Sequence, residues 1–218
     1  MDDRGRKPTP WPSRLVLVSG TTTGVGKTWV AARLLAALRA QGAVVAARKL
    51  SQSYGATALG TDADLLAEAS GEDAGTVCPK HRWYEAAMAP PMAAEVLGRE
   101  PFTLEDLLAE LSWPRGVEYG VVEGVGGPRS PLASGGDTVD LARALQPDHM
   151  VLVAHAGLGT LNSVLLSVDS LPPPAPLVLL NRYDEGRTIH RMNSEWLRRR
   201  EGLEVVTTTD DVVSRLRR

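Results

Sequence analysis

Aliphatic runs without polar alternation are separated along the chain by stretches of helical periodicity. Five runs predict buried strands, at residues 15–18, 43–47, 119–123, 150–154 and 177–180. Helical patterns lie at residues 27–41, 62–69, 89–97, 103–111, 138–145 and 161–170. Strands that are apolar on both sides are typical of parallel sheets covered by helices. We therefore expect an α/β fold of three layers, with a mostly parallel central sheet and helices on both faces.

A glycine-rich segment lies between the first predicted strand and the first predicted helix. Residues 20–28 read GTTTGVGKT. Glycines allow backbone N–H groups to turn toward phosphate oxygens, and the helix N-terminus adds partial positive charge. Lys27 could reach the β- and γ-phosphates, and the Thr28 hydroxyl could bind Mg²⁺. The segment predicts a P-loop of the NTPase type, although five residues separate Gly20 from Gly26 where four are usual; the alternative is a glycine turn before an ordinary helix.

Polar side chains also stand at the ends of further predicted strands: Lys49, Glu123, His155 and Asn181. The carboxyl ends of parallel strands meet at one edge of a sheet, where ligands bind. Glu123 is therefore a candidate Mg²⁺ ligand, and Asp62 is another, although Asp62 could simply cap its helix and Asp64 is a rival. A buried amine at Lys49 would need an anion, whereas an exposed one would reach solvent.

Composition narrows the possible partners. The net charge of −2 gives no reason to expect a nucleic-acid surface, and no apolar run approaches the length of a membrane span. The single cysteine, Cys78, excludes an internal disulfide and is compatible with a cytoplasmic protein. Residues 1–13 contain several prolines and no apolar core, so we interpret them as a disordered tail before a single domain at residues 14–218.

Several motifs together resemble those of the dethiobiotin synthetase family, from about Leu15 to Arg182. They are the unusually spaced loop at 20–28, the strand-end Lys49, the helix-opening Asp62, and the segments 88–90 (MAP), 122–127 (VEGVGG) and 158–162 (LGTLN). The resemblance implies an ATP- and Mg²⁺-dependent cyclo-ligase of biotin biosynthesis. Such enzymes convert 7,8-diaminononanoate, CO₂ and ATP into dethiobiotin, ADP and phosphate, through a carbamate and a mixed anhydride.

The same resemblance implies roles for individual residues. The nucleotide would be held by Gly24, Val25, Gly26, Lys27, Thr28 and Asn181, with Asn181 reading adenine. The metal would be held by Thr28, Asp62 and Glu123. Lys27, Lys49 and Thr23 would be catalytic, with Lys49 between the carbamate and the γ-phosphate. The diamine would contact Thr23 and Ser53, and its carboxylate would meet Gly159, Thr160, Leu161 and Asn162 of the partner subunit in a homodimer.

The substrate half of the resemblance is the less complete one. Tyr54 stands where the family keeps glycine, so we expect it to narrow the pocket beside Lys49. Two alternatives follow. One is a related P-loop ligase that activates a different amine or carboxylate. The other is an ATPase switch of the partition type, which normally carries a lysine where this chain has Thr22.

Overall fold

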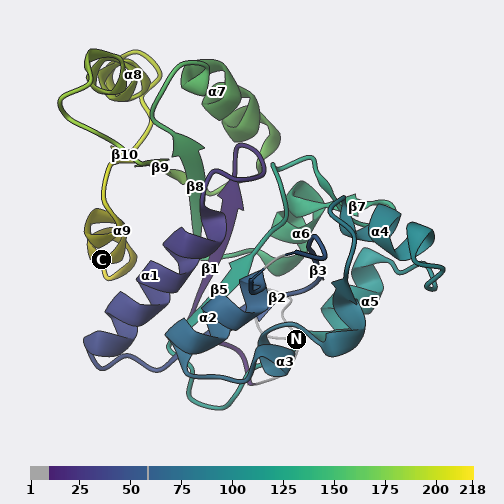
Figure 1. Ribbon diagram of the computed structural model, residues 1–218. Coiled ribbons are helices and arrows are strands. Elements are labelled where there is room, and N and C mark those ends of the chain that lie inside the picture. Colours follow the sequence, from purple (N-terminus) through teal and green to yellow (C-terminus); the bar gives the residue numbers. More distant parts are fainter. Residues whose placement is uncertain (1–9, 58) are drawn as a thin grey trace.

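The computed structural model describes residues 10–57 and 59–218, and within them the chain forms a central six-stranded sheet (Figure 1). The strand order is β10-β9-β8-β1-β5-β2, and all neighbouring pairs are parallel. The strands are β1 (Arg14–Gly20), β2 (Val45–Lys49), β5 (Tyr119–Glu123), β8 (His149–His155), β9 (Leu177–Asn181) and β10 (Val205–Val206). The predicted fold class is confirmed.

Successive side chains of a strand point to opposite faces of the sheet. Because these strands are apolar on both faces, helices cover both faces of the sheet. In β1, Val16 and Val18 face one layer, whereas Leu15 and Leu17 face the other. The first layer contains α1 (Lys27–Ala40), α2 (Asp62–Ser70), α3 (Ala74–Val77) and α9 (Thr209–Leu216). The second contains α4 (Pro90–Val96), α5 (Leu104–Glu110), α6 (Thr138–Leu145), α7 (Thr160–Ser170) and α8 (Thr188–Arg199).

Short elements complete the edge of the sheet where the polar strand ends lie. β3 (Gln52–Ser53) pairs in parallel with β4 (Trp83–Tyr84), which follows the 3-10 turn η1 (Lys80–Arg82). β6 (Pro131–Ala133) pairs antiparallel with β7 (Gly136–Asp137). The sequence analysis missed these strands, since two or three residues are too few to show a period. It also missed α8 and α9, whose polar faces interrupt the apolar pattern.

The start of the chain differs in part from the predicted tail at residues 1–13. Residues 1–9 lie outside the described residues. Trp11 packs edge-on against Trp113 with ring centroids 6.3 Å apart, and the Ser13 N–H donates to the Val117 carbonyl at 3.0 Å. Pro12 is buried against the backbone of Gly120. Residues 11–13 therefore belong to the packed structure, and the prediction was wrong for them.

Within residues 10–57 and 59–218, none of the helices combines the length and the apolar character needed to cross a membrane.

Candidate active site

The glycine-rich loop follows β1 directly and ends where α1 begins, as the P-loop prediction requires. Gly24 and Gly26 have φ of 76° and 97°, in the left-handed region that favours glycine. Gly26 precedes α1, and no side chain of the described residues caps that helix start. The first N–H groups of α1 are therefore available to an anion, together with the positive end of the helix dipole. This geometry fits a bound phosphate group.

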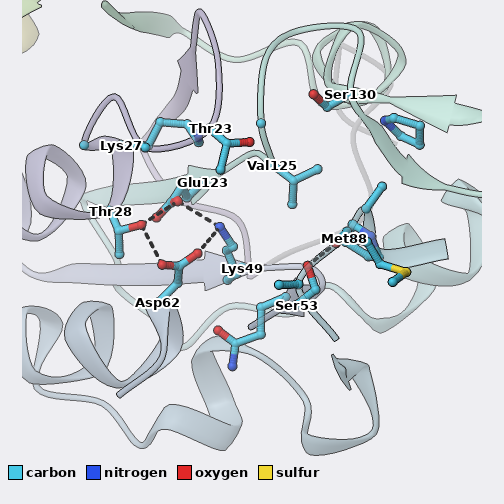
Figure 2. Close-up of a pocket in the computed structure, with 18 residues that line it drawn as sticks. Thr23, Lys27, Thr28, Lys49, Ser53, Asp62, Met88, Glu123, Val125 and Ser130 are labelled. Atoms are coloured by element: carbon cyan, nitrogen blue, oxygen red, sulfur yellow. Dashed lines mark hydrogen bonds and ion pairs between the residues drawn. The ribbon is translucent and has the colours of Figure 1, made fainter. Parts of the chain in front are cut away.

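A cavity of about 530 Å³ opens beside this loop (Figure 2). Most of the predicted site residues line it: Thr23, Gly24, Gly26, Lys27, Thr28, Lys49, Ser53, Asp62 and Glu123. They come from the P-loop, the start of α1, the ends of β2 and β5, β3 and the first turn of α2. Residues far apart in sequence thus meet at the carboxyl edge of the sheet, as expected for a parallel α/β fold.

Two carboxylates, a lysine and a threonine form a connected network in this cavity (Figure 2). The Lys49 Nζ lies 2.7 Å from the Asp62 Oδ2 and 2.8 Å from the Glu123 Oε1. The Thr28 Oγ1 lies 2.9 Å from the Asp62 Oδ1 and 2.9 Å from the Glu123 Oε1. Neither Lys49 nor Glu123 is more than 2% exposed, so their charges interact with little screening by water.

The protonation of these groups follows from burial and mutual charge. Burial opposes the charged form of Lys49, but the carboxylates of Glu123 and Asp62 outweigh it and raise the pKa of the amine. Burial raises the pKa of Glu123, against the opposing charge of Lys49. Asp62 has a lowered pKa: burial opposes its charged form, and the Lys49 charge and hydrogen bond prevail.

Lys27 is the second buried amine of the cavity, and it has a different environment. Its Nζ donates to the Thr22 carbonyl at 3.2 Å. Burial and the nearby charge of Lys49 lower the pKa of Lys27 from 10.5 to about 8. An anion at the P-loop would compensate the Lys27 charge, which fits the predicted contact with a nucleotide phosphate.

The oxygen atoms of Thr28, Asp62 and Glu123 suit a hard divalent cation. The Glu123 Oε2 is buried and has no hydrogen-bond partner among the described residues, so this donor set can accommodate a metal. Asp64, the rival of Asp62, is engaged elsewhere: its carboxylate accepts from the Thr61 N–H at 2.9 Å and completes the capping box of α2. Asp62, not Asp64, therefore lies at the cavity.

The far wall of the cavity contains residues that the sequence analysis did not assign to the site. Gln52, Ser130 and the segment 87–90 are among them, and Ser53 donates a hydrogen bond to the Met88 carbonyl. The Ser130 Oγ accepts from the Gly127 N–H at 2.9 Å, within the loop that follows Glu123. The glycines of that loop were the sequence feature that could have indicated Ser130 as a site residue. Gln52 lies in a two-residue strand, which no pattern predicted.

Tyr54 does not narrow this cavity, so the expectation that it obstructs the pocket was wrong. The ring of Tyr54 packs edge-on against Trp83, with centroids 6.3 Å apart and planes at 88°. Its N–H donates to the Tyr84 carbonyl at 3.0 Å, continuing the pairing of β3 with β4. Among the described residues that line the cavity, Ser53 is present and Tyr54 is not. Adjacent side chains along an extended segment point to opposite sides.

Asn181 lies at a second cavity, of about 540 Å³, which shares Gly26 as a lining residue with the first. The Asn181 Nδ2 donates to the Val25 carbonyl at 2.8 Å, and its Oδ1 accepts from the Arg182 N–H at 2.9 Å. Asn181 therefore attaches the end of β9 to the P-loop, and Val25 takes part through its backbone. The remaining walls of this cavity include Trp29, Tyr183 and residues 207–209, and no sequence pattern singled out Trp29 or Tyr183.

None of residues 159–162 lines either cavity. Gly159 has φ of 88°, the Thr160 hydroxyl donates to the His155 carbonyl, and Leu158 is 94% exposed. Asn162 lines a surface hollow together with Thr21, and this hollow shares Ser130 and Pro131 with the first cavity. Within the described part of one chain, this predicted carboxylate-binding loop does not join the other site residues.

Comparisons with known proteins identify the family to which this chain belongs. Residues 14–204 match a family model described as an AAA domain. The ATP-dependent dethiobiotin synthetase BioD of Haloferax mediterranei is 38% identical over 196 residues, which cover 87% of this chain and 81% of that protein. The protein of the same name from Anaeromyxobacter dehalogenans is 36% identical over 213 residues, 94% of each. This chain belongs to the dethiobiotin synthetase family.

Solved structures similar to this dethiobiotin synthetase family member share its fold. A putative plasmid partition protein from Borrelia burgdorferi, bound to AMPPNP, superposes with a TM-score of 0.50 at 16% identity and covers 93% of this chain and 90% of that one. The signal recognition particle receptor FtsY from Elizabethkingia anophelis has a TM-score of 0.53 at 12% identity, with 99% and 68% covered. At these identities the likeness concerns the fold alone.

Proposed function

We propose that this protein is a dethiobiotin synthetase that uses ATP and Mg²⁺ to close the cyclic urea of dethiobiotin on 7,8-diaminononanoate and CO₂, releasing ADP and phosphate. The observation that carries the proposal is the convergence of Lys27, Thr28, Lys49, Asp62 and Glu123 on one cavity at the P-loop. This cavity occurs in a chain whose curated relatives bear the name of that activity.

The nucleotide half of the cavity has clear assignments. Lys27 and the N–H groups of residues 24–28 hold the phosphates, and Lys27 stabilises the charge that develops during phosphoryl transfer. Thr28, Asp62 and Glu123 hold Mg²⁺, which when bound neutralises phosphate charge. Lys49 is a catalytic residue because its buried ammonium can bind the carbamate oxygens beside the γ-phosphate.

The diamine takes the other half of the cavity, toward β3 and α4. Thr23 and Ser53 contact it there, and the walls at Met88, Pro90 and Val125 provide apolar surface for its carbon chain (Figure 2). An apolar wall also limits the access of water, which would otherwise hydrolyse the phosphorylated carbamate. The base of the nucleotide lies in the second cavity, next to Asn181.

The substrate carboxylate is bound by Gly159, Thr160, Leu161 and Asn162 of a partner subunit in a homodimer. Two features support this part of the proposal: none of residues 159–162 lines the cavity of its own chain, and Leu158 and Leu166 beside this loop are 94% and 64% exposed. We place the protein in the cytoplasm with small-molecule substrates and without nucleic-acid or membrane partners. Sedimentation showing an active monomer at micromolar concentration would contradict the dimer.

The test of the function is ATP turnover with 7,8-diaminononanoate and bicarbonate, compared with turnover when either is omitted. We expect ADP and dethiobiotin to form in equal amounts, and Lys27→Ala to lower the rate about 10²-fold or more with an unchanged melting temperature. Diamine-independent ATP hydrolysis without dethiobiotin would overturn the proposal and favour a switch ATPase. Turnover with a different amine would overturn only the substrate.

A further inference from the structure

Trp29 is an unusually placed aromatic residue on α1. It follows Lys27 and Thr28 directly, and its side chain is 50% exposed. The neighbouring apolar residues Val30 and Leu34 on the same helix are fully buried. Trp29 therefore does not belong to the core, although tryptophan has a large apolar surface that favours burial. This position suggests that a bound ligand, rather than the core, covers the indole ring.

The second cavity indicates which ligand contacts the indole ring. Trp29 lines this cavity of about 540 Å³ together with Gly26, Asn181 and Tyr183. Gly26 also lines the phosphate cavity, so both cavities border the P-loop. A nucleotide with its phosphates at Lys27 would extend its base into the second cavity, past Trp29.

Two polar side chains of this cavity, Asn181 and Thr208, are already engaged in hydrogen bonds. The Asn181 amide donates to the Val25 carbonyl and accepts from the Arg182 N–H. The Thr208 hydroxyl lies 3.1 Å from the Asp211 N–H, from which it accepts, and 2.7 Å from the Asp211 carboxylate. These bonds leave Asn181 and Thr208 with reduced capacity to form hydrogen bonds with the edge of a base. Recognition through an aromatic face does not need such capacity, because every base has a π-face.

A second contact restrains the indole. The guanidinium carbon of Arg33, one turn further along α1, lies 5.7 Å from the centre of the Trp29 ring. Such a cation–π contact holds the ring on one side. A ring held in place loses less conformational entropy when a ligand stacks on it.

From these observations, and resting on ATP as the nucleotide of the proposed function, we infer that Trp29 is the stacking platform for the nucleotide base. Trp29 is thus a binding residue of the second cavity, and it contributes affinity for the base separately from the phosphate contacts of Lys27.

The test compares ATP with Mg²⁺-tripolyphosphate, a ligand that has the phosphates and no base. Dissociation constants are measured by calorimetry for the wild type, Trp29→Leu and Trp29→Phe. We expect Trp29→Leu to weaken ATP binding about tenfold or more, Trp29→Phe to weaken it less, and neither variant to change tripolyphosphate binding. Intrinsic fluorescence provides a second readout, since a base stacked on Trp29 quenches its emission.

Trp196 on α8 is a matched control. It is 48% exposed, and the Arg200 guanidinium carbon lies 5.7 Å from its ring, but it is not one of the described residues that line the cavity. Trp196→Leu should keep wild-type ATP affinity and the ATP-induced quenching, both of which Trp29→Leu loses. Equal ATP affinity in the wild type and Trp29→Leu, or an equal loss of ATP and tripolyphosphate binding in Trp29→Leu, would overturn the role of Trp29. Absence of ATP binding by the wild type would overturn the proposed function itself.

Discussion

Replacing Lys49 by methionine tests the electrostatic reasoning about the site without any substrate. The Lys49 Nζ contacts Asp62 at 2.7 Å and Glu123 at 2.8 Å, and Lys49 is 2% exposed. Removing one partner of a buried ion pair costs about 3–5 kcal/mol, because the other charge stays buried without compensation. The lower end applies here, since the Asp62 side chain is 41% exposed and water can solvate it. We expect Lys49→Met to lower the free energy of unfolding by about 3 kcal/mol, which corresponds to a fall in Tm of roughly 6–12 °C for a chain of this size.

Lys27→Met is the matched control. Lys27 lies in the same cavity, but its surroundings disfavour its charged form, whereas the surroundings of Lys49 favour the charged form of that residue. Burial and the charge of Lys49 lower the pKa of Lys27 from 10.5 to about 8, which corresponds to about 3 kcal/mol against the charged form. Its replacement should leave the Tm unchanged or raise it. Tm is measured at pH 7 by calorimetry in buffer containing EDTA and no nucleotide.

A double variant identifies the source of the loss. In Lys49→Met, the buried Glu123 carboxylate is the uncompensated group, so adding Glu123→Gln should recover part of the lost stability. A Tm for Lys49→Met equal to or above that of Lys27→Met would refute the reasoning. No recovery in the double variant would refute the assignment of the loss to Glu123.

Three further outcomes are expected. Asp62→Asn and Glu123→Gln should each raise the Mg²⁺ concentration needed for half-maximal turnover, whereas Asp64→Asn, whose amide oxygen can still accept from the Thr61 N–H, should leave it unchanged. Tyr54→Gly should leave KM for the diamine unchanged in steady-state assays; a tenfold change would place this ring in the cavity. Burial lowers the pKa of His149 below 6.5, so the unfolded chain binds more protons below that pH and stability falls on acidification. His149→Gln should flatten this slope in denaturation measured between pH 5 and 7.

The sequence alone was sufficient for the features that depend on short-range pattern. The P-loop at residues 20–28 could be predicted because strand, glycines and helix follow one another directly. The meeting of Lys49 and Glu123 could be predicted because both end parallel strands, whose carboxyl ends share one edge of the sheet. Their pairing in the sheet register places the two residues opposite each other on β2 and β5.

Tertiary structure decided what depends on side-chain direction and on contacts between distant segments. Sequence adjacency placed Tyr54 beside Ser53 in the pocket, but the pairing of β3 with β4 turns the phenol toward Trp83. Asp62 and Asp64 were equivalent candidates until the cap of α2 engaged Asp64. Trp29 had no visible role in the sequence, because the cavity that it lines is closed by β9 and the start of α9, about 150 residues further along the chain. A local sequence pattern carries no information about which distant segment will cover a side chain. Tertiary packing determines that contact.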